Sequence, residues 1–260
     1  MQLYGDYHTH TVYSRKKHGK NTIHENVAWA KAKGLKEIAI TDHGYGHMLY
    51  GAKRRKVDKA KKEIEESKLF NEINVLYGIE ANFTSLDGDL DLRDGDYEKL
   101  DILLAGFHSF AKPKTFKDWI KLFLANIFAG KNSVEKLRVR NTETVLNAMN
   151  RYPIDILTHL GAGFPVDIKP IALLAKKKGT YIELNGRRCV FTDEEMKFMI
   201  ENGNKFIINS DAHSSLKVGD CLQPLNFVIK YNIPEKQIVN MDKLPKFTKV
   251  SRKNWVFQEI

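Results

Sequence analysis

Histidines recur at one particular position in this chain, at or just past the end of a short apolar run. The residues that share this position are His8, His10, His43, His108, His159 and His213, with His18 shortly after the first run. A histidine that only fills a core needs one or two hydrogen-bond partners and has no reason to recur at run ends. The pattern therefore indicates a functional site assembled from several distant segments.

The apolar runs themselves predict the fold. Seven of them are short enough to be buried strands, at residues 3–7, 36–41, 75–80, 100–107, 154–158, 180–185 and 206–209. Helical patterns separate most of these runs, at residues 22–34, 55–69, 141–151, 167–178 and 192–202. Strands that alternate with helices are typical of a parallel β/α array. We predict an α/β barrel of seven strands.

The carboxyl ends of the strands in such a barrel converge on one face, so that residues far apart in the sequence share a pocket. Glu80 and Asp211 also stand at strand ends and join the seven histidines. Imidazole and carboxylate ligands without a thiolate suit zinc, manganese or iron, and the lack of cysteine argues against a purely structural zinc site. The nine candidate metal ligands are His8, His10, His18, His43, Glu80, His108, His159, Asp211 and His213.

A cluster of two or three divalent ions suits the hydrolysis of phosphate esters. One ion lowers the pKa of bound water to supply hydroxide, and the others hold the phosphoryl oxygens and the leaving oxygen. Rival schemes lack their motifs, because the chain has neither a Gly-x-Ser-x-Gly elbow nor a Gly-x4-Gly-Lys-[Ser/Thr] phosphate loop. The net charge of +10 favours anionic partners, either small phosphates or nucleic acid, although lysine runs are most often solvated helix faces.

Composition is compatible with one barrel-sized domain over residues 1–260. Hydrophobic residues make up 42% of the chain, and no Pro/Gly/Ser-rich linker divides it. No 18-residue apolar run could span a membrane, and Met1 leads directly into the first ligand-bearing strand. Cys189 and Cys221 are too few for a disulfide framework and are predicted to be free thiols, with Cys189 a structural residue. We expect a cytoplasmic protein.

Residues 112–140 form a predicted insertion directly after His108. An apolar helix at 119–130 lies there among basic residues, and it could be a lid, a dimer contact, a helix at a membrane surface or a cover for the barrel edge. The acidic stretch 87–96 is predicted to be a turn or short hairpin, since it lacks the ligand order of a calcium loop. His24 and His47 are predicted to be surface residues rather than metal ligands, although His47 could touch substrate.

Taken in order, the motifs resemble those of the PHP (polymerase and histidinol phosphatase) domain family, from residue 6 to about residue 219. All nine metal-ligand positions of that family are filled here. Because family X polymerase PHP domains often have an acidic residue near His18, this histidine favours the small stand-alone phosphatases. The motifs are His8-Thr-His10, Thr41-Asp-His43, Gly78-Ile-Glu80-Ala-Asn82, Ala105-Gly-Phe-His108, Thr158-His159 and Asn209-Ser-Asp211-Ala-His213.

The resemblance implies a distorted seven-stranded (β/α)7 TIM-like barrel that holds three divalent ions. One ion would be held by His8, His10, Glu80 and Asp211, a second by Glu80, His108 and His159, and the third by His18, His43 and His213. Among these residues, Glu80, Asp211 and His213 are the candidate catalytic residues. Two departures from the family concern the substrate: Leu160 stands where a proline is common, and the insertion is long. Arg187 and Arg188 follow the sixth strand and are candidate phosphate-binding residues.

Three hypotheses follow for the function. The leading one is a phosphatase, a hydrolase that cleaves a small phosphomonoester, such as histidinol phosphate, by attack of metal-bound hydroxide. The second is a phosphodiesterase or 3′–5′ exonuclease, which would bind nucleic acid in a strongly salt-dependent manner. The third is a non-enzymatic scaffold that binds partners through the helix of the insertion, and the nine intact ligand positions count against it.

Overall fold

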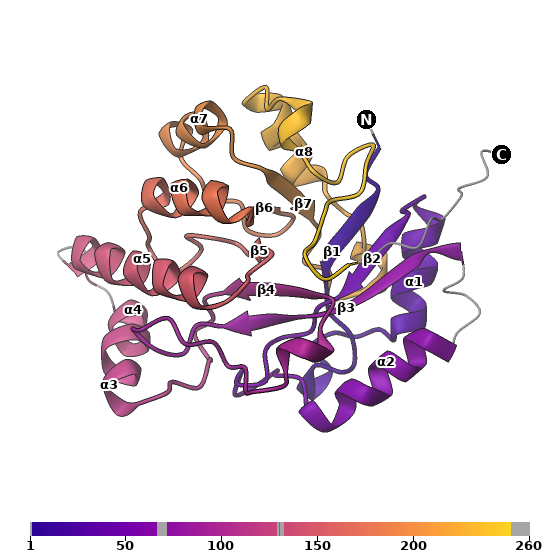
Figure 1. Ribbon diagram of the computed structural model, residues 1–260, viewed down its shortest axis with the longest axis horizontal. Helices are drawn as coiled ribbons and strands as arrows, with labels where there is room; N and C mark the ends of the chain where they lie inside the picture. The colour runs from indigo at the N-terminus through magenta and orange to yellow at the C-terminus, as the bar shows by residue number, and fades with distance from the viewer. Residues whose placement is uncertain (1, 67–71, 129, 131–132, 251–260) are drawn as a thin grey trace.

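Seven parallel strands form one barrel-shaped sheet in the computed structural model, which describes residues 2–66, 72–128, 130 and 133–250. Each strand pairs with the next one in the sequence, and helices lie around the outside (Figure 1). The strands are β1 (Gly5–Thr9), β2 (Glu37–Ile40), β3 (Asn74–Asn82), β4 (Ile102–Gly106), β5 (Ile156–Leu157), β6 (Tyr181–Asn185) and β7 (Phe206–Asn209). The predicted α/β barrel of seven strands is confirmed.

The principal helices are α1 (Ile23–Ala32), α2 (Val57–Glu66), α5 (Val134–Arg151), α6 (Ile168–Lys178), α7 (Asp193–Asn202) and α8 (Leu222–Lys230). Thr22 and Thr192 begin α1 and α7 with capping boxes. In each box the threonine side chain accepts a hydrogen bond from the backbone N–H of the glutamate three residues later, and the side chain of that glutamate accepts one from the backbone N–H of the threonine. Gly179 and Gly203 end α6 and α7 with left-handed backbone, at φ 76° and 78°. These start and stop signals were readable in the sequence.

Alternate residues on the strands explain why the barrel is apolar at one end and polar at the other. Ala39 on β2, Leu76 on β3, Ile102 and Leu104 on β4, and Ile207 on β7 belong to one buried apolar cluster. Continuing each strand in steps of two leads to polar residues at the carboxyl end, because side chains alternate with a period of two. The polar residues reached in this way are His43, Glu80, His108 and Asp211.

The seam between β1 and β7 is closed differently from the other strand pairs. One parallel bridge joins Thr9 to Ala212, just beyond the end of β7, and no ladder between β1 and β7 precedes it in the described residues. Below this bridge, Tyr7 N donates to Asn209 Oδ1 at 2.9 Å. The Asn240 side chain donates to Gly5 O at 2.8 Å and accepts from the backbone N–H of Ile208 at 3.0 Å. Side chains thus replace backbone pairing along this edge.

The described residues of the segment 112–140 are mostly helical, with boundaries that differ from those predicted. It contains α3 (Phe116–Asp118), the π-helical turn η5 (Trp119–Leu124), α4 (Ala125–Ile127) and the beginning of α5. The helix predicted at 141–151 begins instead at Val134, because Leu137 is buried on the same face as Asn141 and Val145. Of the helix predicted at 55–69, residues 67–69 lie outside the described residues. Phe116 and Phe128 are strongly exposed.

The predicted turn at 87–96 is also present. Phe83 and Leu90 form an antiparallel bridge across it. Asp89 and Asp91 within it are engaged by protein groups: Lys114 Nζ donates to Asp89 at 2.8 Å, and Gly46 N donates to Asp91 at 2.6 Å. In the described part of the chain, no helix is both long and apolar enough to cross a membrane.

Candidate metal centre

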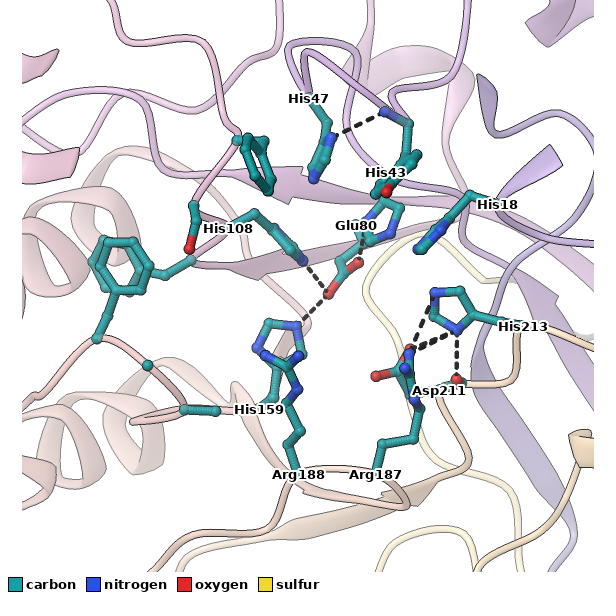
Figure 2. Close-up of a pocket in the computed structure, with 17 residues that line it drawn as sticks. His18, His43, His47, Glu80, His108, His159, Arg187, Arg188, Asp211 and His213 are labelled. Atoms are coloured by element: carbon teal, nitrogen blue, oxygen red, sulfur yellow. Dashed lines mark hydrogen bonds and ion pairs between the residues drawn. The ribbon is translucent and has the colours of Figure 1, made fainter. Parts of the chain in front are cut away.

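The carboxyl ends of the strands bring all nine predicted ligand residues together at one end of the barrel. His8 and His10 come from β1 and the residues after it, His43 from the end of β2, Glu80 from β3 and His108 from beyond β4. His159 follows β5, Asp211 and His213 follow β7, and His18 ends the short 3₁₀ turn after β1. Figure 2 shows most of these side chains pointing toward a common centre around Glu80.

Glu80 is completely buried and lies among four imidazoles. Its carboxylate is 2.7 Å from His159 Nε2, 2.9 Å from His43 Nδ1, 3.2 Å from His8 Nε2 and 3.3 Å from His108 Nε2. A single buried carboxylate within this distance of four histidines, which lie on or just after four different strands, is suited to bind cations together with them.

Asp211 forms a second centre beside Glu80. Its Oδ1 atom is 3.3 Å from His10 Nε2, 3.7 Å from His8 Nε2 and 3.4 Å from His213 Nδ1. The backbone of Asp211 is left-handed, with φ 52°, and His159 has φ 31°. Such conformations are uncommon for non-glycine residues and are found most often where function requires a particular side-chain direction.

Ring contacts place His18 at the outer side of the cluster. Its ring centroid is 4.4 Å from that of His213 and 5.1 Å from that of His43. Tyr50 stacks on His18, with centroids 3.8 Å apart and planes nearly parallel. The aromatic stack fixes the imidazole of His18 although it lies on a loop.

A glycine makes room for one of the ligand candidates. A Cβ atom at Gly106, the last residue of β4, would lie 2.3 Å from Thr158 Oγ1 and 2.9 Å from His159 Cε1. Any side chain there would displace His159 from Glu80, so the position requires glycine.

Several buried atoms of this cluster have no hydrogen-bond partner of suitable geometry. They are His8 Nε2, both ring nitrogens of His10, His43 Nδ1, Glu80 Oε2 and His108 Nδ1. Buried polar atoms without partners are costly and rare, so each calls for an explanation. Three sets of ligand atoms lie close enough to hold an ion: His8 with His10 and Asp211, His10 with His43 and His213, and His43 with Glu80 and His108. Divalent cations would supply the missing partners.

The pKa values of His10, His43 and Glu80 are shifted toward the charge states of metal ligands. Burial and the His213 imidazole lower the pKa of His10 to about 3, and burial with the His10 imidazole holds the pKa of His43 well below its usual range. Burial alone would raise the pKa of Glu80, but the imidazoles of His108 and His8 hold it well below the usual range. Neutral imidazoles and an ionised carboxylate are the forms that bind cations. Burial lowers the pKa of His8 and of His159, but the neighbouring carboxylates, Glu80 foremost, outweigh it and raise the pKa of both.

A cavity of about 250 Å³ opens beside this cluster. Arg187 and Arg188, the predicted phosphate-binding residues, line it from the loop after β6. Arg187 Nη1 lies 2.9 Å from His213 Nδ1 and 3.7 Å from Asp211 Oδ1, and its side chain is half exposed. The aromatic residues Phe107, Phe110 and Phe164 form another part of the wall. The cavity therefore combines positive charge with an apolar surface.

Sequence reasoning missed several residues that hold the cluster in place. Glu183 on β6 is buried and faces His8 Nδ1. Asp42 accepts hydrogen bonds from Thr11 N, Thr11 Oγ1 and Ser14 Oγ, at 2.7, 2.7 and 2.6 Å, and so fixes the loop between His10 and His18. A carboxylate two positions before Asn185 on an otherwise apolar strand was a signal that could have identified Glu183.

The two histidines outside the predicted ligand set differ from each other. His24 is an exposed residue of α1, as predicted, and pairs with Glu63 at 3.2 Å. The prediction that His47 lies on the surface is wrong, because His47 is only 3% exposed to solvent and lines the cavity. The loop after β2 folds back over the barrel end, which its sequence position did not reveal.

Both cysteines are buried free thiols, as predicted. Burial raises the pKa of Cys189 to about 12 and the pKa of Cys221 well above its usual range. Neither thiol has the lowered pKa of a reactive cysteine.

The fold and the cluster together define a class, the TIM-like barrels with a cluster of histidine and carboxylate side chains at the carboxyl ends of their strands. Two solved structures share the fold. One is the histidinol phosphate phosphatase of Lactococcus lactis, solved with zinc, L-histidinol and phosphate (TM-score 0.53, 14% identity, 88% of this chain and 94% of that chain). The other was solved as a "putative histidinol phosphatase" of Listeria monocytogenes (TM-score 0.58, 15% identity, 83% of this chain and 97% of that chain).

Sequence comparison gives the family. Residues 6–162 match the PHP domain. A probable phosphatase of Thermoanaerobacter sp. strain X514 is 31% identical over 256 residues, which cover 93% of this chain and 92% of that protein. A probable phosphatase of Caldanaerobacter subterraneus is 31% identical over 268 residues, covering 97% and 94%. The chain belongs to the PHP domain family, as its motifs predicted.

Proposed function

We propose that this protein is a metal-dependent phosphatase that hydrolyses a small phosphomonoester. The observation that carries the proposal is the convergence of nine imidazole and carboxylate side chains, Glu80 among them, beside a cavity lined by Arg187 and Arg188; several of the nine have buried atoms that lack partners. The relatives named as probable phosphatases support the same reaction class.

The ligand assignment remains that of the family resemblance. We propose three ions of zinc, manganese or iron, held by His8, His10, Glu80 and Asp211, by Glu80, His108 and His159, and by His18, His43 and His213. When bound, such ions lower the pKa of water and neutralise charge on a phosphoryl group. The short distances from Glu80 to His159 and from Asp211 to His10 support this division.

The protein's own residues supply binding and orientation. Arg187 and Arg188 are placed to donate hydrogen bonds to phosphoryl oxygens on the open side of the cavity, and guanidinium groups match that geometry. Glu80, Asp211 and His213 are the proposed catalytic residues, since they belong to the ligand cluster and also line the cavity. The aromatic wall of Phe107, Phe110 and Phe164 suits a leaving group with an apolar part; histidinol phosphate is one candidate.

We further propose that residues 1–260 form a single PHP domain that carries 112–140 as an insertion. Two buried free thiols are compatible with a reducing compartment, which supports a cytoplasmic location.

Phosphate release by metal-reconstituted protein tests the proposal, with a chromogenic phosphomonoester and a phosphodiester assayed in parallel. We expect monoester turnover that is lost in His8→Ala and in Asp211→Ala. The matched control is His24→Ala, which removes an exposed imidazole of α1 and should keep full activity. Turnover of the diester alone would replace the phosphatase with the phosphodiesterase hypothesis, and no turnover with any of the three metals would overturn both.

A further inference from the structure

His47 is an additional imidazole in the cavity wall, held in a tight loop after β2. Its backbone N–H donates to Gly44 O at 3.0 Å, and its carbonyl accepts from Gly51 N at 2.9 Å and from Arg15 Nη2 at 2.8 Å. Figure 2 shows its ring across Glu80 from Arg187 and Arg188. His47 therefore stands on the wall opposite the two arginines.

One hydrogen bond determines which ring nitrogen of His47 carries the proton. The backbone N–H of Tyr50 donates to His47 Nδ1 at 3.1 Å. A backbone amide can only donate, so Nδ1 must offer a lone pair and the ring proton must be on Nε2. The arrangement is the reverse of His8, whose Nδ1 faces the Glu183 carboxylate as a donor and whose Nε2 is left with a lone pair. His47 thus presents an N–H group where the ligand candidates present a lone pair.

The ring is fixed in this orientation by its neighbours. It stacks on His43, with centroids 4.9 Å apart and planes 27° apart, and on Tyr50 at 5.1 Å. The ring of His108 meets it in an edge-to-face arrangement, with centroids 5.6 Å apart. Within the described part of the chain, no protein group accepts a hydrogen bond from His47 Nε2. A fixed donor that faces a cavity beside a cation site needs an acceptor, and an anionic oxygen of the cavity's ligand is the natural one.

We propose that His47 is a phosphoryl-binding residue, whose Nε2–H donates to a non-bridging oxygen of the substrate's phosphate from the wall opposite Arg187 and Arg188. This inference rests on the proposed phosphatase function. The inference adds to that function a substrate contact that the predicted ligand set does not contain. It also implies that His47 is not a tenth metal ligand.

Two substitutions distinguish the effect of the Nε2–H donor of His47 from the effect of its stacked ring. His47→Phe keeps a flat ring for the stacks on His43 and Tyr50 but removes Nε2–H, whereas His47→Gln retains an amide N–H that can reach the same point. The probe is inorganic phosphate, titrated calorimetrically into the zinc-reconstituted proteins. We expect His47→Phe to weaken phosphate binding about 10- to 100-fold, as for loss of a hydrogen bond to a charged group, and His47→Gln to restore most of it. His24→Phe is the matched control and should bind phosphate like the wild type.

Metal content and the ring tautomer distinguish this role from its rivals. Bound zinc per chain should be the same in wild type, His47→Phe and His47→Gln, and ¹⁵N NMR should show the proton of His47 on Nε2. Loss of one ion in the variants, or a proton on Nδ1, would overturn the proposal, as would unchanged phosphate binding in His47→Phe. These measurements need no turnover: phosphate binding that depends on His47 would stand even if the wild type hydrolysed no monoester, which would refute the proposed function alone.

Discussion

Glu183 Oε1 lies 2.8 Å from Nδ1 of His8, although the two residues are 175 positions apart in the sequence. The same carboxylate accepts the backbone N–H of His159 at 2.8 Å and the amide of Asn209 at 2.9 Å. A carboxylate on one ring nitrogen fixes the tautomer of a histidine and makes the other nitrogen a better ligand. Glu183 therefore orients two candidate ligands from a position between them.

We expect Glu183→Gln to weaken metal binding about 10- to 100-fold, as outer-shell substitutions typically do. The glutamine keeps the size of the side chain but loses the negative charge that polarises His8. Competition with a chromogenic chelator measures the affinity, and Glu194→Gln on the exposed surface of α7 is the control. Equal affinities in the two variants would show that Glu183 serves packing only.

Asp42→Ala should destabilise the metal-free protein by about 3 kcal/mol, because it leaves the buried donors of Thr11 and Ser14 without an acceptor. Urea unfolding of the metal-free proteins gives the free-energy difference without a contribution from ions. Asp58→Ala, at an exposed position of α2, should change it by less than about 0.5 kcal/mol. A similar small change in Asp42→Ala would contradict the assigned role.

The stability of the protein should depend on pH through Asp155, which precedes β5. Burial raises its pKa to about 6, although its carboxylate accepts the N–H of Leu103 at 2.8 Å. A pKa raised by folding means that the protonated form is favoured in the native state. The associated stability is present below the unfolded pKa near 4 and is lost as the pH rises through 6.

Asp155→Asn removes this dependence. Between pH 4 and pH 7, the free energy of unfolding of the variant should therefore rise relative to that of the wild type by at most about 2 kcal/mol. Chemical unfolding of both proteins across that range measures the difference, and other titrating groups cancel in the comparison. A difference that does not change with pH, or that favours the wild type at higher pH, would refute the raised pKa.

Metal ions should raise the melting temperature in proportion to the logarithm of their free concentration. The reason is that the buried atoms of the cluster gain partners only in the folded protein, so each tenfold rise in free metal adds about 1.4 kcal/mol per ion bound. Differential scanning fluorimetry with buffered zinc or manganese measures the shift. His10→Ala should reduce the slope and His24→Ala should not; equal slopes in both would place the ions elsewhere.

The fold and the cluster were predictable for the same physical reason. Strand ends are visible in the sequence as apolar runs, and imidazole or carboxylate groups after them are visible as exceptions to that pattern. These two signals alone were enough to predict that His43, Glu80 and Asp211 lie together at one end of the barrel.

The sequence signals failed where the role of a residue depends on the path of a loop or on a neighbouring strand. His47 looked like a surface residue because nothing local shows that its loop returns over the barrel, with Ala111 as its bridge partner. Glu183 lies inside a strand, where its charge is an exception to the apolar pattern, but only its place beside His8 shows which side chain it orients. The early start of α5 depends on the burial of Leu137, which is a tertiary effect.

Cations bound at the proposed sites would couple their binding to the closure of the barrel at the seam between β1 and β7. His8 and His10 stand on one edge of this seam, while Asp211 and His213 stand on the other. Tyr7, Asn209 and Asn240 hold the edges together through side-chain hydrogen bonds in place of a ladder. An ion shared between His10 and Asp211 would link β1 to β7, so we expect a chelator to weaken the contact between these two strands, which share one bridge and no ladder in the described residues.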